Sequence, residues 1–190
     1  MGRISARRYL CACVAMLAFG TSSAGTKHCQ NDEITITMTP TVLVERIATT
    51  FPSVPMPERV AEEGAYDSDD INREFRRYRD GLIGDQVFFD NRTALPVLSL
   101  EGFQALFPGY LRYVVNNPAS DVSDYLASFL SGESPKLVTD ARLATMNRPQ
   151  INLLCTLLDW VAQKVEASEP QLAKSLRDSR MRVVAAAAPN

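Results

Sequence analysis

Two consecutive amphipathic segments between Leu100 and Leu130 limit the folds open to this chain more than any other feature. Within Asp121–Leu130 the apolar residues recur at i, i+3, i+4, i+7 and i+8, the spacing of one buried helical face: Val122, Tyr125, Leu126, Phe129 and Leu130. Ser99 can cap a first helix that starts at Leu100. Pro108 lacks the N–H that a helix interior needs, so we expect that helix to kink or restart there. Both apolar faces need partners, which a helical core supplies.

Helix starts and stops surround this stretch on both sides. Thr39-Pro40 predicts a helix that runs to about Thr50, and Pro52, Pro55 and Pro57 then form a stiff connector. The capping-box pattern Asn147–Gln150 opens the most hydrophobic helix, Ser168–Gln171 opens a last one, and Ser131–Thr139 is expected to be a loop. We therefore predict a mainly α protein, a single compact multi-helix domain over residues 39–184 with a disordered tail at 185–190.

The first residues have the composition of a targeting segment. Three arginines precede an apolar run from Tyr9 to Phe19, and Ser22-Ser23-Ala24 supplies the small residues that a signal peptidase reads. We predict a signal peptide over 1–24, cleaved after Ala24, and a periplasmic or secreted protein with no stable membrane span thereafter. An uncleaved anchor and lipidation at Cys11 or Cys13 are the alternatives. In the arm that follows, residues 25–38, the alternation over Glu33–Met38 fits a lone strand and an extended segment equally.

Cleavage would change both the charge and the cysteine content. The removed residues include three arginines and no acid, which leaves 17 basic and 22 acidic side chains and a net charge of −5. An acidic exported protein is a poor ligand for nucleic acid and a plausible one for a basic protein, although simple solubility also explains the charge. Two cysteines would remain, Cys29 and Cys155. In an oxidising compartment they are candidates for one disulfide, and a buried Cys155 thiol is the alternative.

The most charged part of the chain lies between Glu62 and Asp80. Its acidic residues are the candidate partner-binding residues: Glu62, Glu63, Asp67, Asp69 and Asp70. Asp67 or Ser68 can cap a helix with acids in its first turn and arginines toward its end, so a solvated helix arranged with its own dipole is the competing interpretation. Farther along, Asn91-Arg92-Thr93 matches a glycosylation triplet, a motif that is frequent by chance.

Two segments resemble an uncharacterised bacterial family, one of the domains of unknown function. The first is the aromatic-rich helix Phe103–Leu111, in which four residues separate Phe103 from Pro108 and a small residue, Tyr and Leu follow. The second is the helix that starts at Pro149-Gln150 and ends in Leu158-Asp159-Trp160. An acidic patch ahead of an aromatic helix, Asp67 to Tyr78, is also similar. The chain departs from the family in Ala105, Leu106 and its export signal. The resemblance implies a compact helical domain and no activity.

The residues available exclude several chemistries. His28 is the only histidine, so a Ser-His-Asp or Cys-His centre would have to use it, and one histidine with two cysteines makes a zinc or iron site improbable. No glycine-rich phosphate loop is present, and we expect no cofactor. The chain is therefore predicted to be a non-catalytic binding or inhibitory protein of the bacterial envelope, such as an immunity protein for an exported toxin. An envelope assembly factor that self-associates near Pro108, and a carboxylate-based hydrolase, are the alternatives.

Overall fold

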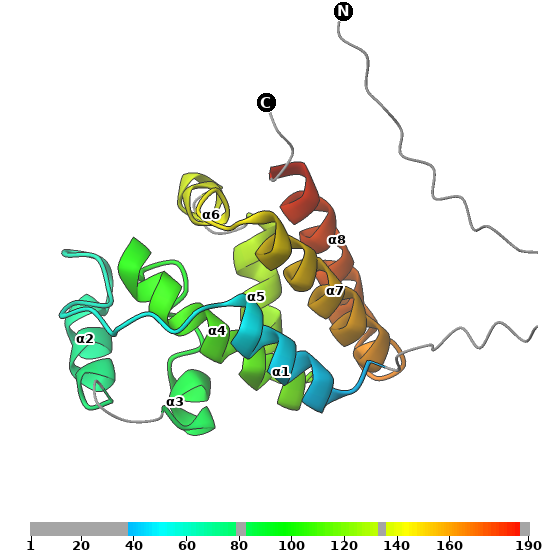
Figure 1. Ribbon diagram of the computed structural model, residues 1–190, viewed down its shortest axis with the longest axis horizontal. Coiled ribbons are helices and arrows are strands. Elements are labelled where there is room, and N and C mark those ends of the chain that lie inside the picture. The colour runs from blue at the N-terminus through cyan, green and yellow to red at the C-terminus, as the bar shows by residue number, and fades with distance from the viewer. Residues whose placement is uncertain (1–37, 79–82, 133–135, 187–190) are drawn as a thin grey trace, which may run out of the picture. The chain divides into compact units, whose positions relative to one another are not determined.

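Helix α4, Leu100–Asn116, packs against α1, α3, α5 and α7 in the computed structural model (Figure 1). The structure describes residues 38–78, 83–132 and 136–186. These ranges contain eight helices and no strand, which confirms the prediction of a mainly α, single compact domain. The other seven helices are α1 Pro40–Thr50, α2 Ser68–Arg76, α3 Asp85–Asp90, α5 Asp121–Ser131, α6 Lys136–Leu143, α7 Arg148–Val165 and α8 Pro170–Ala186.

Several predictions concern residues outside these ranges. They are the signal peptide over 1–24, the arm up to residue 37 with its strand pattern, His28, Cys29 and the last four residues of the predicted tail. The first described residue, Met38, has its carbonyl oxygen bound by the indole Nε1 of Trp160 at 2.9 Å. α8 ends at Ala186 and therefore includes the first two residues of that tail.

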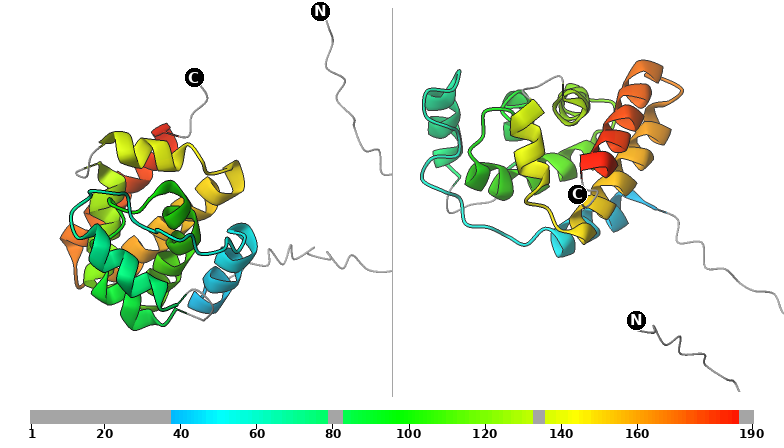
Figure 2. Two further views of the ribbon diagram at one scale, coloured as in Figure 1. Left: turned by 90° about the vertical axis from the view of Figure 1, so that its left-hand side faces the viewer. Right: turned by 90° about the horizontal axis from the view of Figure 1, so that it is seen from above.

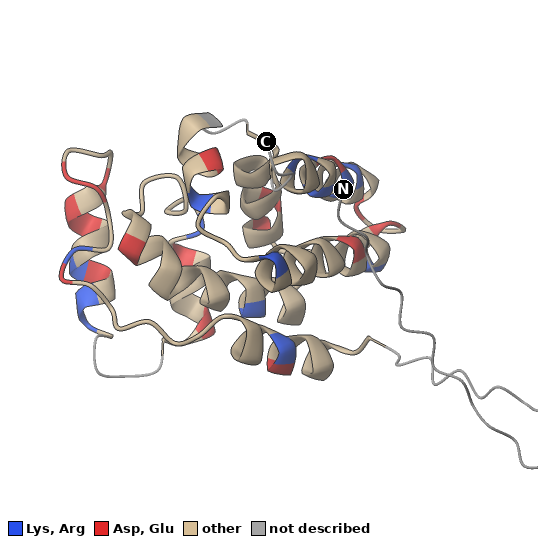
Figure 3. Cartoon of the chain, turned by 45° about the horizontal axis from the view of Figure 1, so that its top comes forward, with Lys and Arg blue, Asp and Glu red and all other residues tan. Residues whose placement is uncertain are grey.

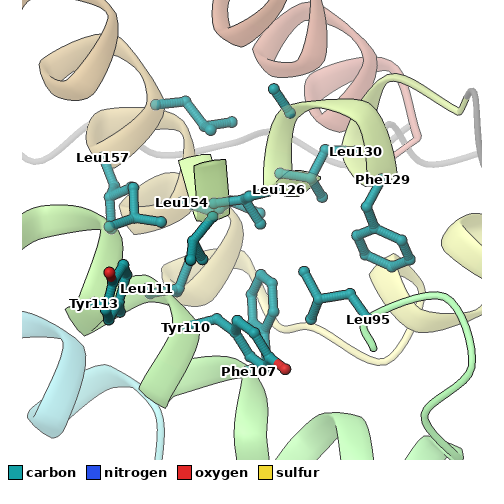
Figure 4. Packing of buried hydrophobic residues seen from close by; sticks show 14 of the residues in the cluster. Leu95, Phe107, Tyr110, Leu111, Tyr113, Leu126, Phe129, Leu130, Leu154 and Leu157 are labelled. Atoms are coloured by element: carbon teal, nitrogen blue, oxygen red, sulfur yellow. The ribbon is translucent and has the colours of Figure 1, made fainter. Parts of the chain in front are cut away.

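α4 does not restart at Pro108, because the helix continues through this residue, and the alternative expectation of a kink there stays a prediction. A proline inside a helix costs about 3 kcal/mol, so packing on both sides has to compensate for it. Four neighbours do so, since Leu106, Phe107, Tyr110 and Leu111 are all fully buried. Figure 4 shows three of them directed into the core, together with leucines of α5 and α7. Pro108 itself lies on the half-exposed side of the helix.

α3 packs directly on α4 through a glycine. A side chain on Gly109 would collide with the ring of Phe88, so this crossing requires the bare backbone. The hydroxyl of Tyr110 donates to the Asn91 carbonyl oxygen at 2.6 Å, and the Asn91 side-chain nitrogen donates to the Val87 carbonyl at 2.9 Å. Burial raises the pKa of Tyr110 far above its ordinary value. The bond from the buried Tyr110 hydroxyl therefore fixes the end of α3 to α4.

α7 and α8 form an antiparallel pair, and α8 packs on α5 (Figure 2). The predicted capping box of α7 is confirmed, with Asn147 accepting from the Gln150 N–H and Gln150 accepting from the Asn147 N–H. Arg180 of α8 pairs with Asp159 of α7 at 2.7 Å. The buried Ser179 hydroxyl donates to the Ala127 carbonyl of α5 at 2.8 Å. These contacts join α8 to α7 and α5, while α7 also packs against α1 and α4.

Three local expectations were wrong. Part of the stretch predicted as loop over Ser131–Thr139 belongs to α6, whose inward side is formed by the polar Thr139 and Arg142 rather than by apolar residues alone. Neither residue at the start of α2 forms the expected cap, because Asp67 precedes the helix in a left-handed conformation, φ 55°, and makes no capping hydrogen bond. Tyr125 was placed on the buried face but is 42% exposed, its ring lying against the Arg92 guanidinium.

Candidate functional site

The five predicted acidic residues lie together on the loop before α2 and on its first turn. We call residues 62–70 the acidic loop, and Figure 3 shows the acidic positions gathered there. The loop reverses direction at Gly64, φ 76°, and at Asp67. Glycine adopts this left-handed conformation without strain and Asp tolerates it, so both residues suit the turn. All five acidic side chains are exposed.

A buried asparagine holds the base of the acidic loop. The Oδ1 of Asn72 accepts hydrogen bonds from the backbone N–H groups of Val60 at 2.7 Å and Ala61 at 3.0 Å. The N–H of Ser99 then donates to the Val60 carbonyl at 2.8 Å, next to the bridge between Ala61 and Leu98. The loop therefore begins from a fixed backbone. Sequence reasoning missed Asn72, because a polar residue inside a charged helix gives no sign that it points inward.

Arginines pair with some of the acids. Asp70 pairs with Arg73, and Asp69 lies 3.9 Å from Arg59, both at exposed positions where such pairs contribute little. Glu63 and Asp67 form no ion pair with any described residue. The loop thus retains negative charge that is available to an external cation.

One aromatic side chain stands out among these acids. Tyr66 is 85% exposed, as much as any large apolar or aromatic residue in the described ranges. Acidic residues flank it in sequence at Glu62, Glu63, Asp67 and Asp69. Sequence reasoning missed Tyr66, although an aromatic residue inside a polar turn was the signal that could have identified it.

Arg142 of α6 connects the acidic loop to the core. Its side chain is only 3% exposed; it donates to the Leu98 carbonyl and lies 3.5 Å from Glu62. Burial lowers the pKa of the guanidinium, and the nearby Glu62 carboxylate opposes that shift. The guanidinium carbon lies 5.6 Å from the centre of the Phe103 ring. Arg142 therefore has a structural role and is not open to a ligand.

Two apolar pockets lie beside the connector that follows α1. The first, about 210 Å³, is walled by Phe103 and Phe107 of α4 and by Met146. The second, about 200 Å³, is walled by Ala105 and Pro108 among others. Phe51, Pro52 and Val54 line both pockets and form a ridge between them. We call the two pockets and their ridge the α4 groove.

A third hollow, about 300 Å³ between α5 and α8, has a polar lining that includes Asp124 and Asp178. Two carboxylates in one hollow are what a carboxylate-based hydrolase would need. Both side chains are exposed to water. Neither has the apolar surroundings that make a carboxyl group a general acid at neutral pH. The geometry therefore adds no support to the hydrolase alternative.

Cys155 is half-buried in a surface hollow between α7 and α8 and forms no disulfide with any described residue. Burial raises the pKa of this thiol, and the nearby Arg180 lowers it by less. The disulfide to Cys29 stays a prediction, because Cys29 lies outside the described ranges. Across those ranges, no three His, Cys, Asp or Glu side chains gather as a metal site would require. Nor does any described helix combine the length and apolarity needed to cross a membrane.

Comparison with known proteins identifies no relative. No protein-family model, no curated protein and no solved structure matches the chain. The resemblance to an uncharacterised bacterial family therefore stays a prediction.

Proposed function

We propose that this chain is an exported, non-catalytic binding protein whose acidic loop receives a basic surface of another protein. The observation that supports the proposal best is the position of Tyr66, which is 85% exposed in the middle of the acidic loop. An exposed tyrosine is normally unremarkable, but tyrosine is one of the residues that most often dominate binding energy at protein interfaces. Because acidic residues flank it in sequence, Tyr66 offers an aromatic contact within a negatively charged surface.

Charge and anchor would play different roles in this interaction. The acids would steer a basic partner during its approach and raise the association rate at low salt. Once docked, the partner would cover the Tyr66 ring and exclude water from it. Asn72 supports this role because it fixes the backbone at Val60 and Ala61, so the loop loses less conformational freedom on binding.

The export signal narrows the class of partner that we propose. An acidic protein outside the cytoplasm, with no histidine in its described domain, suits a role in occluding another protein better than a role in catalysis. We therefore propose an inhibitor of a basic exported protein, for example an immunity protein for a toxin. The predicted signal peptide over 1–24 supports this localisation.

The test is affinity capture from the envelope fraction of the cells that produce the protein. We expect the wild-type chain to retain a specific partner at about 50 mM NaCl and to release it at about 500 mM, because salt screens exposed charges. Tyr66→Ala, and a combined Glu63→Gln, Asp67→Asn, Asp69→Asn, Asp70→Asn variant, should each lose the partner. Asp124→Asn, Asp178→Asn is the matched control, since it removes acids from another surface. Equal capture by every variant would refute the proposal.

Self-association is the second candidate, and one observation favours it. Pro108 and Ala105 form part of an apolar hollow that is open to solvent, which is the region where the sequence suggested a contact between copies. Sedimentation velocity at working concentration tests this directly. A monomer at all concentrations would remove this candidate and leave the proposed inhibitor unaffected.

A further inference from the structure

The α4 groove has two compartments with unequal surroundings. Phe51 and Pro52 separate them, so a compact apolar molecule placed in one pocket would not reach the other. A peptide can fill both, because side chains a few positions apart project from the same side of a strand or helix. The shape thus favours a peptide with two apolar side chains over a single small molecule.

The connector that borders the α4 groove is rich in proline. Pro52, Pro55 and Pro57 keep the connector out of a helical conformation, and it runs along α4 toward α2 (Figure 1). Pro108 also removes the N–H that would normally bind the carbonyl oxygen of Gln104, one turn earlier. Gln104 lines the first pocket. Because of Pro108, the Gln104 carbonyl lacks its usual helical donor.

Opposite charges stand at the two ends of α4. At its start, Gly102 packs against the backbone of Val60, two residues before the acidic loop. At the far end, the exposed Arg112 lines the second pocket and forms no ion pair with a described residue. A peptide lying along the groove would therefore meet negative charge at one end and positive charge at the other.

We infer that the α4 groove binds an amphipathic segment of the protein partner, with two apolar anchors between a basic end and an acidic end. This inference rests on the proposed function and adds to it the part of the partner that is recognised. The basic end would lie toward the acidic loop, the anchors would occupy the two pockets, and the acidic end would pair with Arg112. The order of charges makes the recognition directional.

The test uses synthetic peptides titrated into the isotopically labelled full chain and followed by NMR. Each peptide has two leucines about two to four positions apart, with two lysines at one end and two glutamates at the other, in both chain directions. We expect one spacing to bind and to shift the amide signals of Val54, Ala105 and Arg112. Exchanging its lysines with its glutamates should weaken binding about tenfold or more.

Two variants locate the contact. Ala105→Phe fills the second pocket and should weaken binding about tenfold, whereas Ala141→Phe, on the exposed side of α6, should not. Arg112→Gln tests the charge without touching the core. It should weaken the peptide with glutamates about threefold and leave a version with glutamines unchanged, and Arg76→Gln is its control.

Any of the following results would overturn the inference. The first is that no peptide binds at about 1 mM, or that Ala105→Phe binds as well as the wild type. The second is a dimer of the free chain that Ala105→Phe abolishes, which would make a second copy the occupant. The third is that sodium decanoate binds in the pockets and the peptides do not. If acidic-loop variants lose the captured partner and Ala105→Phe keeps it, this inference fails while the proposed function survives.

Discussion

The guanidinium of Arg142 lies over the ring of Phe103, 5.6 Å from its centre, while donating to the Leu98 carbonyl. One buried side chain thus joins α6, the turn before α4 and the aromatic core. Its Nε has no hydrogen-bond partner among the described residues. Truncation of this arginine to alanine and its replacement by an apolar side chain of similar size should therefore change the free energy of unfolding by different amounts.

We predict that Arg142→Ala lowers the free energy of unfolding by about 3 kcal/mol, because it leaves a cavity and unpaired carbonyls. Arg142→Met leaves the same carbonyls unpaired but fills the space and ends the burial of a charge, so its cost should be smaller, about 1 to 2 kcal/mol. Urea denaturation measures both changes. Arg76→Met, at an exposed position of α2, should stay within about 0.5 kcal/mol of the wild type. Equal losses for Ala and Met would contradict the account.

Tyr110 should make stability depend on pH in the alkaline range. Its pKa is raised in the folded state, so the contribution is complete below the unfolded pKa of about 10 and is lost as the pH rises above it. Each further pH unit should cost about 1.4 kcal/mol, because only the unfolded tyrosine releases its proton. The measurement is urea unfolding from pH 8 to 11 of wild type and Tyr110→Phe.

The Tyr110→Phe variant should lose about 1 kcal/mol at pH 8, where the Asn91 carbonyl loses its donor, and should decline less steeply above pH 10. Tyr66→Phe is the control, since its ring is exposed and should leave the pH profile unchanged. If the free energies of unfolding of wild type and Tyr110→Phe fall in parallel as the pH rises, burial of the Tyr110 hydroxyl does not control the pH dependence of stability.

Asn72 should matter more than its place in a charged helix suggests. Asn72→Ala removes the acceptor of two buried N–H groups and should destabilise the chain by about 2 kcal/mol. It should also speed hydrogen exchange at the backbone amides of Val60 and Ala61, and leave exchange within the helices unchanged. Asn152→Ala, at an exposed position of α7, provides the comparison. Unchanged exchange at Val60 would argue against an anchored loop.

The Cys155 thiol should react slowly. Burial raises its pKa, which reduces the fraction of thiolate at pH 8 and slows alkylation by iodoacetamide relative to free cysteine. Its rate should reach half-maximum at a higher pH than that of the free amino acid. Mass spectrometry of the non-reduced chain from residue 25 then tests the predicted pairing with Cys29, since two alkylated cysteines would exclude it.

Sequence patterns predicted most of the helices because those helices have a regular apolar face and local capping signals. The capping box at Asn147 is an example, since both of its bonds depend on residues three positions apart. α6 was not predicted, because two polar residues, Thr139 and Arg142, face inward. Their burial depends on carbonyl acceptors outside the helix, at Phe129 and Leu98, which lie 10 and 44 residues away in sequence. The acidic residues were found by charge alone. Their support by Asn72 is a tertiary property that no local pattern encodes, whereas an aromatic residue inside a polar turn was a local signal for Tyr66.

The hydrogen bonds around Asn91 bear on the Asn91-Arg92-Thr93 triplet. The nitrogen that a glycosyl transfer would modify donates to the Val87 carbonyl at 2.9 Å, and the backbone of the same residue accepts from Tyr110. In the folded chain this side chain is half-buried and its nitrogen is already bonded at the end of α3. An oligosaccharyltransferase should therefore modify this asparagine more slowly in the folded protein than in the unfolded chain.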